Sequence, residues 1–203
     1  KKFNIVTSKG MLMYGPPGTG KTTFAKAVAG EIDAKFIHVQ SSDVLDKYIG
    51  ESERKLNAIF EEASTERTII LFDEFDQIAS ATATSDVSKR LVAQLKELID
   101  GFSSSENVYV LAATNYPDKI EFGLRRRLVP IYLGLPSVAE VSELIKLKMR
   151  KMPVEEFIDI KVFADRLIGY SGSDVDRIVG LAAKSAARRE RQQRTINDNY
   201  STS

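Results

Sequence analysis

The sequence predicts an α/β fold, a parallel sheet with flanking helices, followed by a small all-helical domain. Strand-like and helix-like segments alternate from the N-terminus to about residue 135 of the 203-residue chain. Such alternation is typical of a parallel sheet whose strands are joined by helices. After Leu135-Pro136 only helical periodicities follow. We therefore expect an α/β large domain over residues 1–136 and a small helical (lid) domain over residues 137–203.

Five apolar segments are the expected strands, near residues 11–14, 35–40, 68–73, 107–113 and 129–133. The third is a continuous apolar run, which is typical of a parallel strand buried on both faces. Between the strands, apolar residues recur at helical spacing, as at Leu56, Ile59, Phe60 and Ala63 and at Leu91, Leu95, Leu98 and Ile99. The second domain has the same spacing, as at Val141, Leu144, Ile145 and Met149.

The composition is that of an ordinary globular protein, with 43% hydrophobic and 28% charged residues. The 29 basic and 28 acidic side chains nearly cancel, so no general positive field favours nucleic acid or an anionic membrane. We interpret the one basic run as a solvated helix face, formed by Lys184, Arg188, Arg189, Arg191 and Arg194. The chain has no cysteine and no apolar run of membrane-spanning length. We expect an intracellular, cytoplasmic protein, while an anchor or targeting segment upstream of Lys1 stays open.

A phosphate-binding loop is predicted between the first expected strand and the helix-forming segment after it. This stretch reads Gly15-Pro16-Pro17-Gly18-Thr19-Gly20-Lys21-Thr22, which fits the Walker A pattern G-x-x-x-x-G-K-[ST]. Glycines allow turns that point successive N–H groups at phosphates, and the helix adds the positive end of its dipole. We expect Lys21 to contact the β- and γ-phosphates and Thr22 to bind Mg²⁺, with Thr23 next to them in the nucleotide site.

Two adjacent carboxylates follow the third expected strand. Asp73 and Glu74 come directly after Ile69-Ile70-Leu71-Phe72, and the carboxyl ends of parallel strands meet at the crevice where ligands bind. We expect Asp73 to hold, through a water molecule, the Mg²⁺ that Thr22 also touches, and Glu74 to polarise the attacking water. The alternative is a strand followed by an acidic helix start. His38, in the second expected strand, has no second ligand residue beside it, so we expect no metal site there.

These two motifs and four further segments together resemble the AAA ATPases, the family that includes the proteasomal ATPases, katanin and spastin. The further segments are Tyr48-Ile49-Gly50-Glu51-Ser52-Glu53, Ala113-Thr114-Asn115, Leu124-Arg125-Arg126-Arg127 and Gly169-Tyr170-Ser171-Gly172-Ser173-Asp174. The resemblance extends from about residue 10 to about residue 189. It implies the P-loop NTPase fold, Mg²⁺-dependent hydrolysis of ATP to ADP and phosphate, and a ring of six subunits, either a homo-oligomer or a hetero-ring of related subunits.

Polar residues after the fourth expected strand are further candidates for the catalytic site. The amide of Asn115 could bridge the attacking water and the γ-phosphate, and the resemblance assigns this position to a nucleotide sensor; the alternative is a turn-forming Asn. Arg126 and Arg127 fall where the resemblance places arginine fingers, which stabilise the transition state in a neighbouring subunit's site. Salt bridges within the domain are the alternative. The sequence departs from the family after Arg127, where Leu128-Val129-Pro130-Ile131 replaces the usual Gly-Arg-Phe-Asp-Arg.

Two other segments are predicted to touch the substrate and the nucleotide. Tyr48 and Ile49 resemble the pore loop with which protein-threading members grip an extended chain, and a tyrosine offers a large rigid contact without a sequence demand. The alternative is that both residues pack against the following helix. In the helical domain, Ser171 and Asp174 form a variant of the capping box, and the resemblance brings the backbone of Gly172-Ser173 close to the adenine.

Three functional classes fit these motifs. The leading hypothesis is an ATP-driven ring that unfolds, remodels or disassembles protein substrates by threading them through a central pore. A nucleic-acid-associated ATPase, of clamp-loader or helicase type, should have a basic surface, and the near-neutral charge counts against it. An ATP-binding scaffold without turnover is the third class. Its usual mark would be the loss of Glu74 or of the arginines, and the chain retains both.

Overall fold

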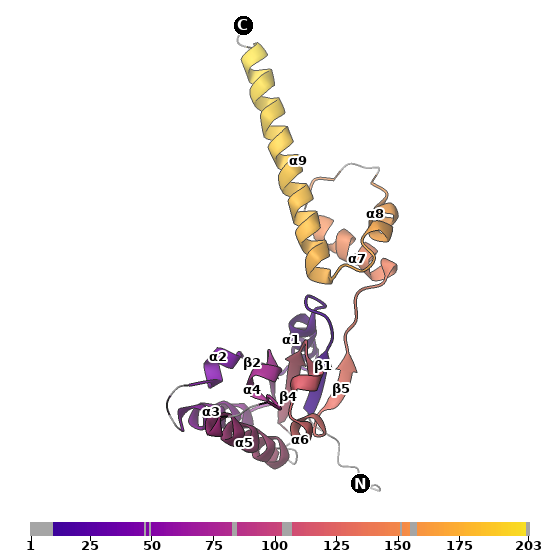
Figure 1. The fold of residues 1–203 in the computed structure, drawn as a ribbon. Coiled ribbons are helices and arrows are strands. Elements are labelled where there is room, and N and C mark those ends of the chain that lie inside the picture. The colour runs from indigo at the N-terminus through magenta and orange to yellow at the C-terminus, as the bar shows by residue number, and fades with distance from the viewer. Residues whose placement is uncertain are drawn as a thin grey trace. The chain divides into compact units, whose positions relative to one another are not determined.

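The computed structural model describes residues 10–46, 48, 50–82, 85–102, 107–150, 152–154 and 158–201. The chain divides into two compact units, one formed by Lys1–Pro16 and Gly20–Leu133 and the other by Pro17–Thr19 and Gly134–Ser203. The first unit contains a five-stranded parallel sheet and the second contains helices (Figure 1). The expected α/β fold with a helical C-terminal segment is therefore confirmed.

The sheet has the strand order β2-β3-β4-β1-β5, and all its pairings are parallel. Its strands are β1 (Gly10–Tyr14), β2 (Lys35–Val39), β3 (Thr68–Phe72), β4 (Val108–Thr114) and β5 (Val129–Tyr132). Each lies within one residue of its expected bounds. Because the strands are parallel, their carboxyl ends meet at one edge of the sheet, where the Walker A loop follows β1 and Asp73 follows β3.

Helices cover both faces of the sheet. α1 (Lys21–Glu31) packs against one face, where Ala25 and Ala29 join a core with Ile69 and Leu71. The other face carries a larger core, to which α3 (Glu51–Ser64) and α5 (Asp86–Phe102) contribute Leu56, Phe60, Leu91 and Leu95. Alternate residues of β3 enter the two cores and all five are buried. The continuous apolar run of β3 is thereby explained.

Short helices connect these elements at the two edges of the sheet. They are α2 (Ser41–Val44), α4 (Phe75–Ile78), the 3₁₀ turn η1 (Pro117–Lys119) and α6 (Phe122–Arg125). Figure 1 shows α6 at the amino ends of the strands, the edge opposite to that at which α1 begins. Arg126 and Arg127, which directly follow α6, therefore lie at the edge of the sheet opposite to the Walker A loop.

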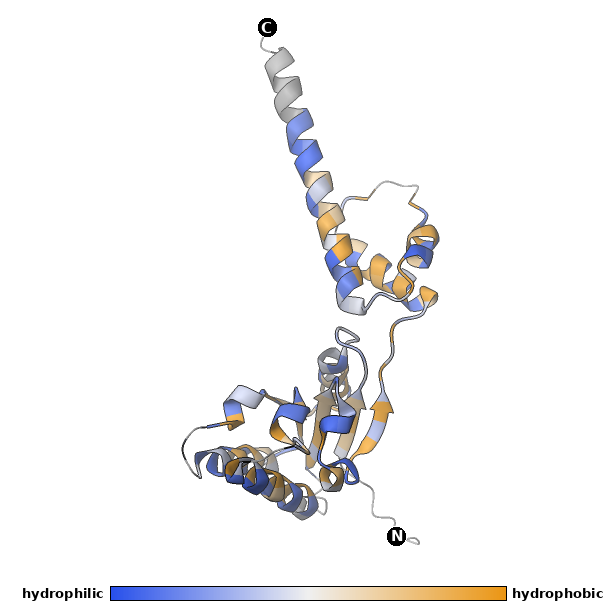
Figure 2. Ribbon diagram, in the orientation of Figure 1, coloured by the Kyte–Doolittle hydropathy of each residue, from blue (hydrophilic) through white to orange (hydrophobic). Residues whose placement is uncertain are grey.

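The helical unit is built from α7 (Val138–Met149), α8 (Ile160–Arg166) and α9 (Gly172–Ser201). Its core contains Val141, Ile145, Ala164 and Val175, one or two from each helix. Figure 2 shows that hydrophobic residues gather on α7, α8 and the first turns of α9, whereas the following turns of α9 are hydrophilic. In the described part of the chain, no helix combines the length and the apolar character that a bilayer crossing needs.

Candidate functional site

The Walker A loop leaves β1 through a glycine that no other residue can replace without a clash. Gly15 has φ 147°, and a Cβ atom at this position would lie 2.1 Å from the backbone carbonyl oxygen of Leu133. The loop is held there because the N–H of Leu133 donates to the carbonyl of Tyr14 (2.8 Å). The first glycine of the motif is thus required by the sheet beneath it.

Lys21 begins α1 and is the most buried charged residue described, with 9% of its surface exposed. Its ammonium donates to the carbonyls of Gly15 (2.9 Å) and Pro16 (2.8 Å), both on its own loop. Burial lowers the pKa of Lys21, and the charge of Asp73 opposes this shift. Both hydrogen-bond acceptors are neutral, so an anionic ligand would relieve the cost of burying this cation.

We expect Lys21→Ala to abolish nucleotide binding, because the substitution removes the buried cation of the loop. Titration with a fluorescent ATP analogue measures this, and the affinity should fall by at least a hundred-fold, about 3 kcal/mol. Lys26→Ala is the matched control, since Lys26 lies on the same helix with its side chain exposed. Equal losses in the two variants would contradict the assignment.

A hydroxyl and a carboxylate, both oxygen ligands of the kind that Mg²⁺ binds, meet beside Lys21. Thr22 Oγ1 donates to Asp73 Oδ2 (2.8 Å), although the two residues are 51 positions apart. Mg²⁺ prefers oxygen ligands about 2.0–2.1 Å away in an octahedron, so neighbouring ligands lie about 3 Å apart. The two oxygens therefore fit the ion. The described residues contain no group of three or more His, Cys, Asp or Glu side chains suited to a metal.

His38 also touches this carboxylate. Its Nε2 lies 3.3 Å from Asp73 Oδ2, because β2 and β3 are neighbours and both residues are at their carboxyl ends. Sequence reasoning placed no role on His38. The signal that could have found it is the pairing of adjacent parallel strands, which brings the ends of β2 and β3 to the same edge.

Glu74 stands next to Asp73 in an unusual backbone conformation. Its φ of 50° and ψ of 44° are left-handed, and of the described residues other than glycine only Asp33 shares a positive φ. Such a conformation costs of order 1 kcal/mol and is concentrated at functional sites. The N–H of Glu74 donates to Asp73 Oδ1 (3.0 Å), and its carboxylate accepts from Gln77 Nε2 (2.6 Å).

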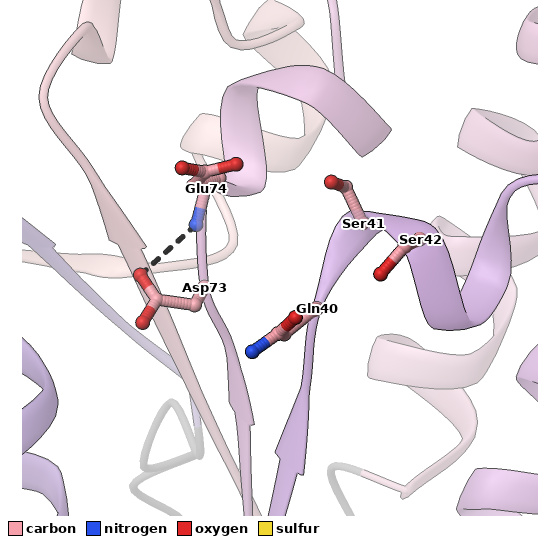
Figure 3. Close-up of a pocket in the computed structure, with 5 residues that line it drawn as sticks. All are labelled: Gln40, Ser41, Ser42, Asp73 and Glu74. Carbon is pink, nitrogen blue, oxygen red and sulfur yellow. Dashed lines mark hydrogen bonds between the residues drawn. The ribbon is translucent and has the colours of Figure 1, made fainter.

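The two carboxylates line a polar cavity of about 290 Å³. Its other lining residues, Gln40, Ser41 and Ser42, come from the end of β2 and from α2. Figure 3 shows Asp73 and Glu74 on one side of this cavity and the two serines on the other. A cavity of this kind beside Glu74 has room for water molecules.

Asn115 follows β4 directly and its side chain is exposed. β4 lies between β1 and β3, so Asn115 leaves the sheet between the Walker A loop and Asp73. The neighbouring Thr114 is buried and fixed, since its Oγ1 donates to Asp76 Oδ1 (2.5 Å) and accepts from the Tyr116 N–H (2.9 Å). The structure thus places Asn115 at the predicted edge, and its sensor role stays a prediction.

The three arginines differ in their surroundings. Arg127 makes a bidentate pair with Asp100 (2.8 and 2.7 Å) and also donates to the Gly123 carbonyl. Arg125 pairs with Asp118 (3.2 Å). Arg126 is exposed and lies over the Phe122 ring, 5.5 Å from its centroid, with no carboxylate partner in the described structure. The expected alternative of salt bridges within the domain thus applies to Arg125 and Arg127.

The Asp100–Arg127 pair predicts a pH-dependent contribution to stability. The hydrogen bond from Arg127 holds the pKa of Asp100 below its ordinary value. A lowered folded-state pKa means that the stabilisation is present above about pH 4, where the unfolded carboxyl is ionised, and is lost as the pH falls through the folded-state pKa.

We expect Asp100→Asn to lower the free energy of unfolding by about 0.5–1 kcal/mol at pH 7, with the difference shrinking as the pH approaches 3. Urea unfolding at both pH values measures it. Asp165→Asn, which removes an exposed carboxylate from α8, controls for net charge. A difference that grows on acidification would contradict the pairing.

Tyr48 has an exposed side chain and a backbone N–H that is hydrogen-bonded to Asp46. Its side chain is 76% exposed, whereas Asp46 beneath it accepts from the Tyr48 N–H (3.1 Å) and from Lys55 Nζ (2.8 Å). The buried Ser52 accepts from the Asp46 N–H (2.9 Å). Packing of the Tyr48 ring against the next helix, the alternative considered above, does not fit this exposure. Ile49 lies outside the described residues.

In the helical unit, the predicted capping box is confirmed. Ser171 Oγ accepts from the Asp174 N–H (3.2 Å) and donates to Asp174 Oδ2 (2.7 Å), which also accepts from the Ser171 N–H. Within the same unit, the Ser173 N–H donates to the carbonyl of Gly18 (3.1 Å). Ser173 thus contacts a residue of the Walker A loop, and the approach of Gly172 and Ser173 to adenine stays a prediction.

Comparison with known proteins identifies the family. The model of the ATPase family associated with various cellular activities (AAA) matches residues 11–135, which include both motifs and all of the five strands except Gly10, the first residue of β1. The chain belongs to the AAA family. This confirms the resemblance found in the sequence.

The relatives of this AAA chain are longer proteins. It is 42% identical to the cell division cycle protein 48 homolog of Archaeoglobus fulgidus, over 93% of this chain and 27% of that protein. It is also 42% identical to a katanin p60 ATPase-containing subunit from Danio rerio, over 91% of this chain and 40% of that protein. The putative ribosome biogenesis ATPase nvl of Dictyostelium discoideum is 40% identical, with 93% and 23% covered. The chain therefore spans about a quarter to two fifths of these relatives.

Proposed function

We propose that this AAA chain hydrolyses ATP with Mg²⁺, that it does so in a ring, and that the ring threads protein substrates. The observation that supports the ATPase most is the junction of Thr22 and Asp73 beside the buried Lys21. It supplies a hard-oxygen pair for a divalent cation and a cation for phosphates within one turn of a helix N-terminus. ATPases are also named among the relatives.

The residues divide the chemistry between them. Lys21 would leave its loop carbonyls for the β- and γ-phosphates, while Thr22 and Asp73 would hold Mg²⁺. When bound, the ion neutralises developing charge on the phosphate oxygens. Glu74 would accept a hydrogen bond from the attacking water in the cavity of Figure 3 and polarise it. Asn115 would orient the same water from the end of β4.

The place of Arg126 supports a site shared between subunits. Arg126 precedes β5, whereas the Walker A loop follows the carboxyl end of β1, and these strands are parallel with Met11 paired to Val129. Four strand residues span about 13 Å at 3.3 Å each, and an arginine side chain of six bonds of about 1.5 Å reaches about 7 Å. Arg126 therefore suits the site of a neighbouring subunit, and repeated head-to-tail contacts of this kind close a ring. We propose six subunits from the family resemblance.

Threading is the part of the proposal that rests on Tyr48. The Tyr48 side chain is exposed, and its N–H is bonded to Asp46, which Lys55 and Ser52 hold in turn, so the aromatic ring is available to an extended polypeptide. Its contact area is apolar and requires no particular sequence, so it suits a polypeptide of any composition. We propose protein as the substrate class and no nucleic acid, since the net charge of the chain is +1.

We expect Tyr48→Ala to keep at least half of the ATPase rate, because the Tyr48 side chain is not among the proposed catalytic residues. The variant should lose the ability to unfold a protein substrate. The assay follows ATP-dependent unfolding of a fluorescent protein that carries an unstructured polypeptide tail. Tyr48→Phe is the matched control and should unfold the substrate within about two-fold of the wild-type rate. Wild-type unfolding by Tyr48→Ala would contradict the threading assignment.

The hydrolysis itself is tested by phosphate release from ATP in the presence of Mg²⁺ or of a chelator. The proposal requires turnover that depends on the ion and is absent from Lys21→Ala. Turnover that survives chelation would contradict the role given to Thr22 and Asp73. Binding of ATP without any turnover would favour a scaffold instead.

A further inference from the structure

A glutamine outside the predicted catalytic set touches the carboxylate of Glu74. Gln77 lies one turn further along α4, and its Nε2 donates to Glu74 Oε2 at 2.6 Å. Among the described residues, Gln77 is the hydrogen-bond partner that the structure gives to the Glu74 carboxylate. The neighbouring Asp73 carboxylate accepts from Thr22 and from the Glu74 N–H.

The glutamine is itself held by a residue of α2, the short helix that follows β2. Ser41, the first residue of α2, donates from Oγ to Gln77 Oε1 at 2.8 Å. This bond fixes the orientation of the Gln77 amide, because its oxygen faces a hydroxyl donor and its NH₂ group faces a carboxylate, which can only accept. A chain of two hydrogen bonds therefore runs from Ser41, at the start of α2, through Gln77 to Glu74, at the start of α4.

The backbone at both ends of this chain is firmly placed. The Asp73 N–H donates to the Val39 carbonyl (2.9 Å), so the ends of β2 and β3 stay paired. The Gln77 N–H donates to the Glu74 carbonyl (2.9 Å). A side-chain bridge between two fixed anchors leaves the Glu74 carboxylate with little rotational freedom.

We propose that Gln77, fixed by Ser41, is a positioning residue for Glu74. Glu74 is on the surface with left-handed backbone, so packing alone does not fix its side chain. Gln77 holds one carboxylate oxygen and leaves the other for the attacking water. A water held in one place relative to the phosphate reacts faster, and a displacement of about 1 Å can cost up to a hundred-fold in rate. This inference rests on the proposed role of Glu74.

Two nearly isosteric substitutions separate positioning from packing. Gln77→Met keeps the length of the side chain and removes the donor, and Gln77→Glu keeps the shape and the bond from Ser41 but places a second carboxylate against Glu74. We expect kcat for ATP hydrolysis to fall about ten-fold in Gln77→Met and at least as far in Gln77→Glu, with KM for ATP within about two-fold. A packing role would leave both variants near the wild-type rate.

The serine is tested in the same way. Ser41→Ala removes the hydroxyl that orients Gln77, and we expect kcat to fall about three-fold below that of Ser64→Ala. Ser64 is the matched control because it is an exposed serine on α3, outside the residues that line the cavity. Combining Ser41→Ala with Gln77→Met should add nothing to Gln77→Met alone, since the hydroxyl acts through the amide.

Nucleotide affinity supplies a readout that does not depend on turnover. The Kd of a fluorescent ATP analogue should stay within two-fold of the wild-type value in all Gln77 and Ser41 variants. A fall in affinity that accounts for the rate, an unchanged kcat, or a rise in kcat would each overturn the inference. If Glu74→Gln also turned over at the wild-type rate, the proposed catalytic role would fail first; if only the Gln77 variants were unaffected, that role would stand and the positioning role would fall.

Discussion

Glu74→Gln is expected to bind ATP and to hydrolyse it at a rate at least a hundred-fold below wild type. The substitution keeps the shape of the side chain and the reach to the cavity, but an amide cannot take a proton from water. General base catalysis typically contributes about 10² to 10⁴ in rate. Phosphate release and the affinity for a fluorescent ATP analogue measure the two effects separately.

The left-handed backbone at Glu74 needs a control of its own. Gln tolerates φ 50° about as well as Glu, so Glu74→Gln should leave the urea unfolding midpoint unchanged. Glu62→Gln, an exposed glutamate on α3, controls for the lost charge. Normal turnover by Glu74→Gln would mean that another group activates the water.

Arg126→Ala is expected to have the second large effect, a fall in kcat of about 10³- to 10⁵-fold. An arginine that stabilises phosphoryl transfer in the site of a neighbouring protomer usually raises kcat by this factor. The rate of ATP hydrolysis at saturating ATP measures it. Stability should change little, because the Arg126 side chain is exposed and lies over a ring. Nucleotide affinity should also persist.

Arg127→Ala should show a different pattern. Removing this guanidinium leaves Asp100 without its bidentate partner, so we expect a lower free energy of unfolding together with any loss of rate. Both arginines are predicted fingers, and Arg126 is our choice because its side chain is exposed whereas Arg127 is paired with Asp100. A wild-type rate in Arg126→Ala with an inactive, stable Arg127→Ala would reverse this order.

Much of the fold could be predicted because the signals lie within short stretches of chain. The strand Ile69–Phe72 is apolar at every position because it is buried on both faces, and Asp73 must then emerge at the carboxyl edge. The Walker A residues follow from covalent spacing, since Gly15 and Lys21 are only six residues apart. The capping of α9 by Ser171 and Asp174 is equally local.

The contacts that sequence reasoning missed join distant parts of the chain. His38 reaches Asp73 across 35 residues, Ser41 reaches Gln77 across 36, and Arg127 reaches Asp100 across 27. The hydrophobic periodicity of the sequence does not indicate such pairs, because each depends on which strands are neighbours in the sheet and on side-chain rotamers. Three adjacent arginines look equivalent in sequence, and only their surroundings distinguish Arg126.

If one protomer completes the catalytic site of the next, two inactive variants should restore activity to each other when they are mixed. We would measure the ATPase rate per protomer against protein concentration for wild type, Glu74→Gln, Arg126→Ala and an equal mixture of the two variants. A mixed assembly can bring an intact Glu74 to an intact Arg126 across an interface. We expect a rate that rises with protein concentration in wild type, collapses in each variant alone and partly returns in the mixture. A rate that is independent of concentration and indifferent to Arg126 would show that the site is complete within one protomer, and would contradict the shared site.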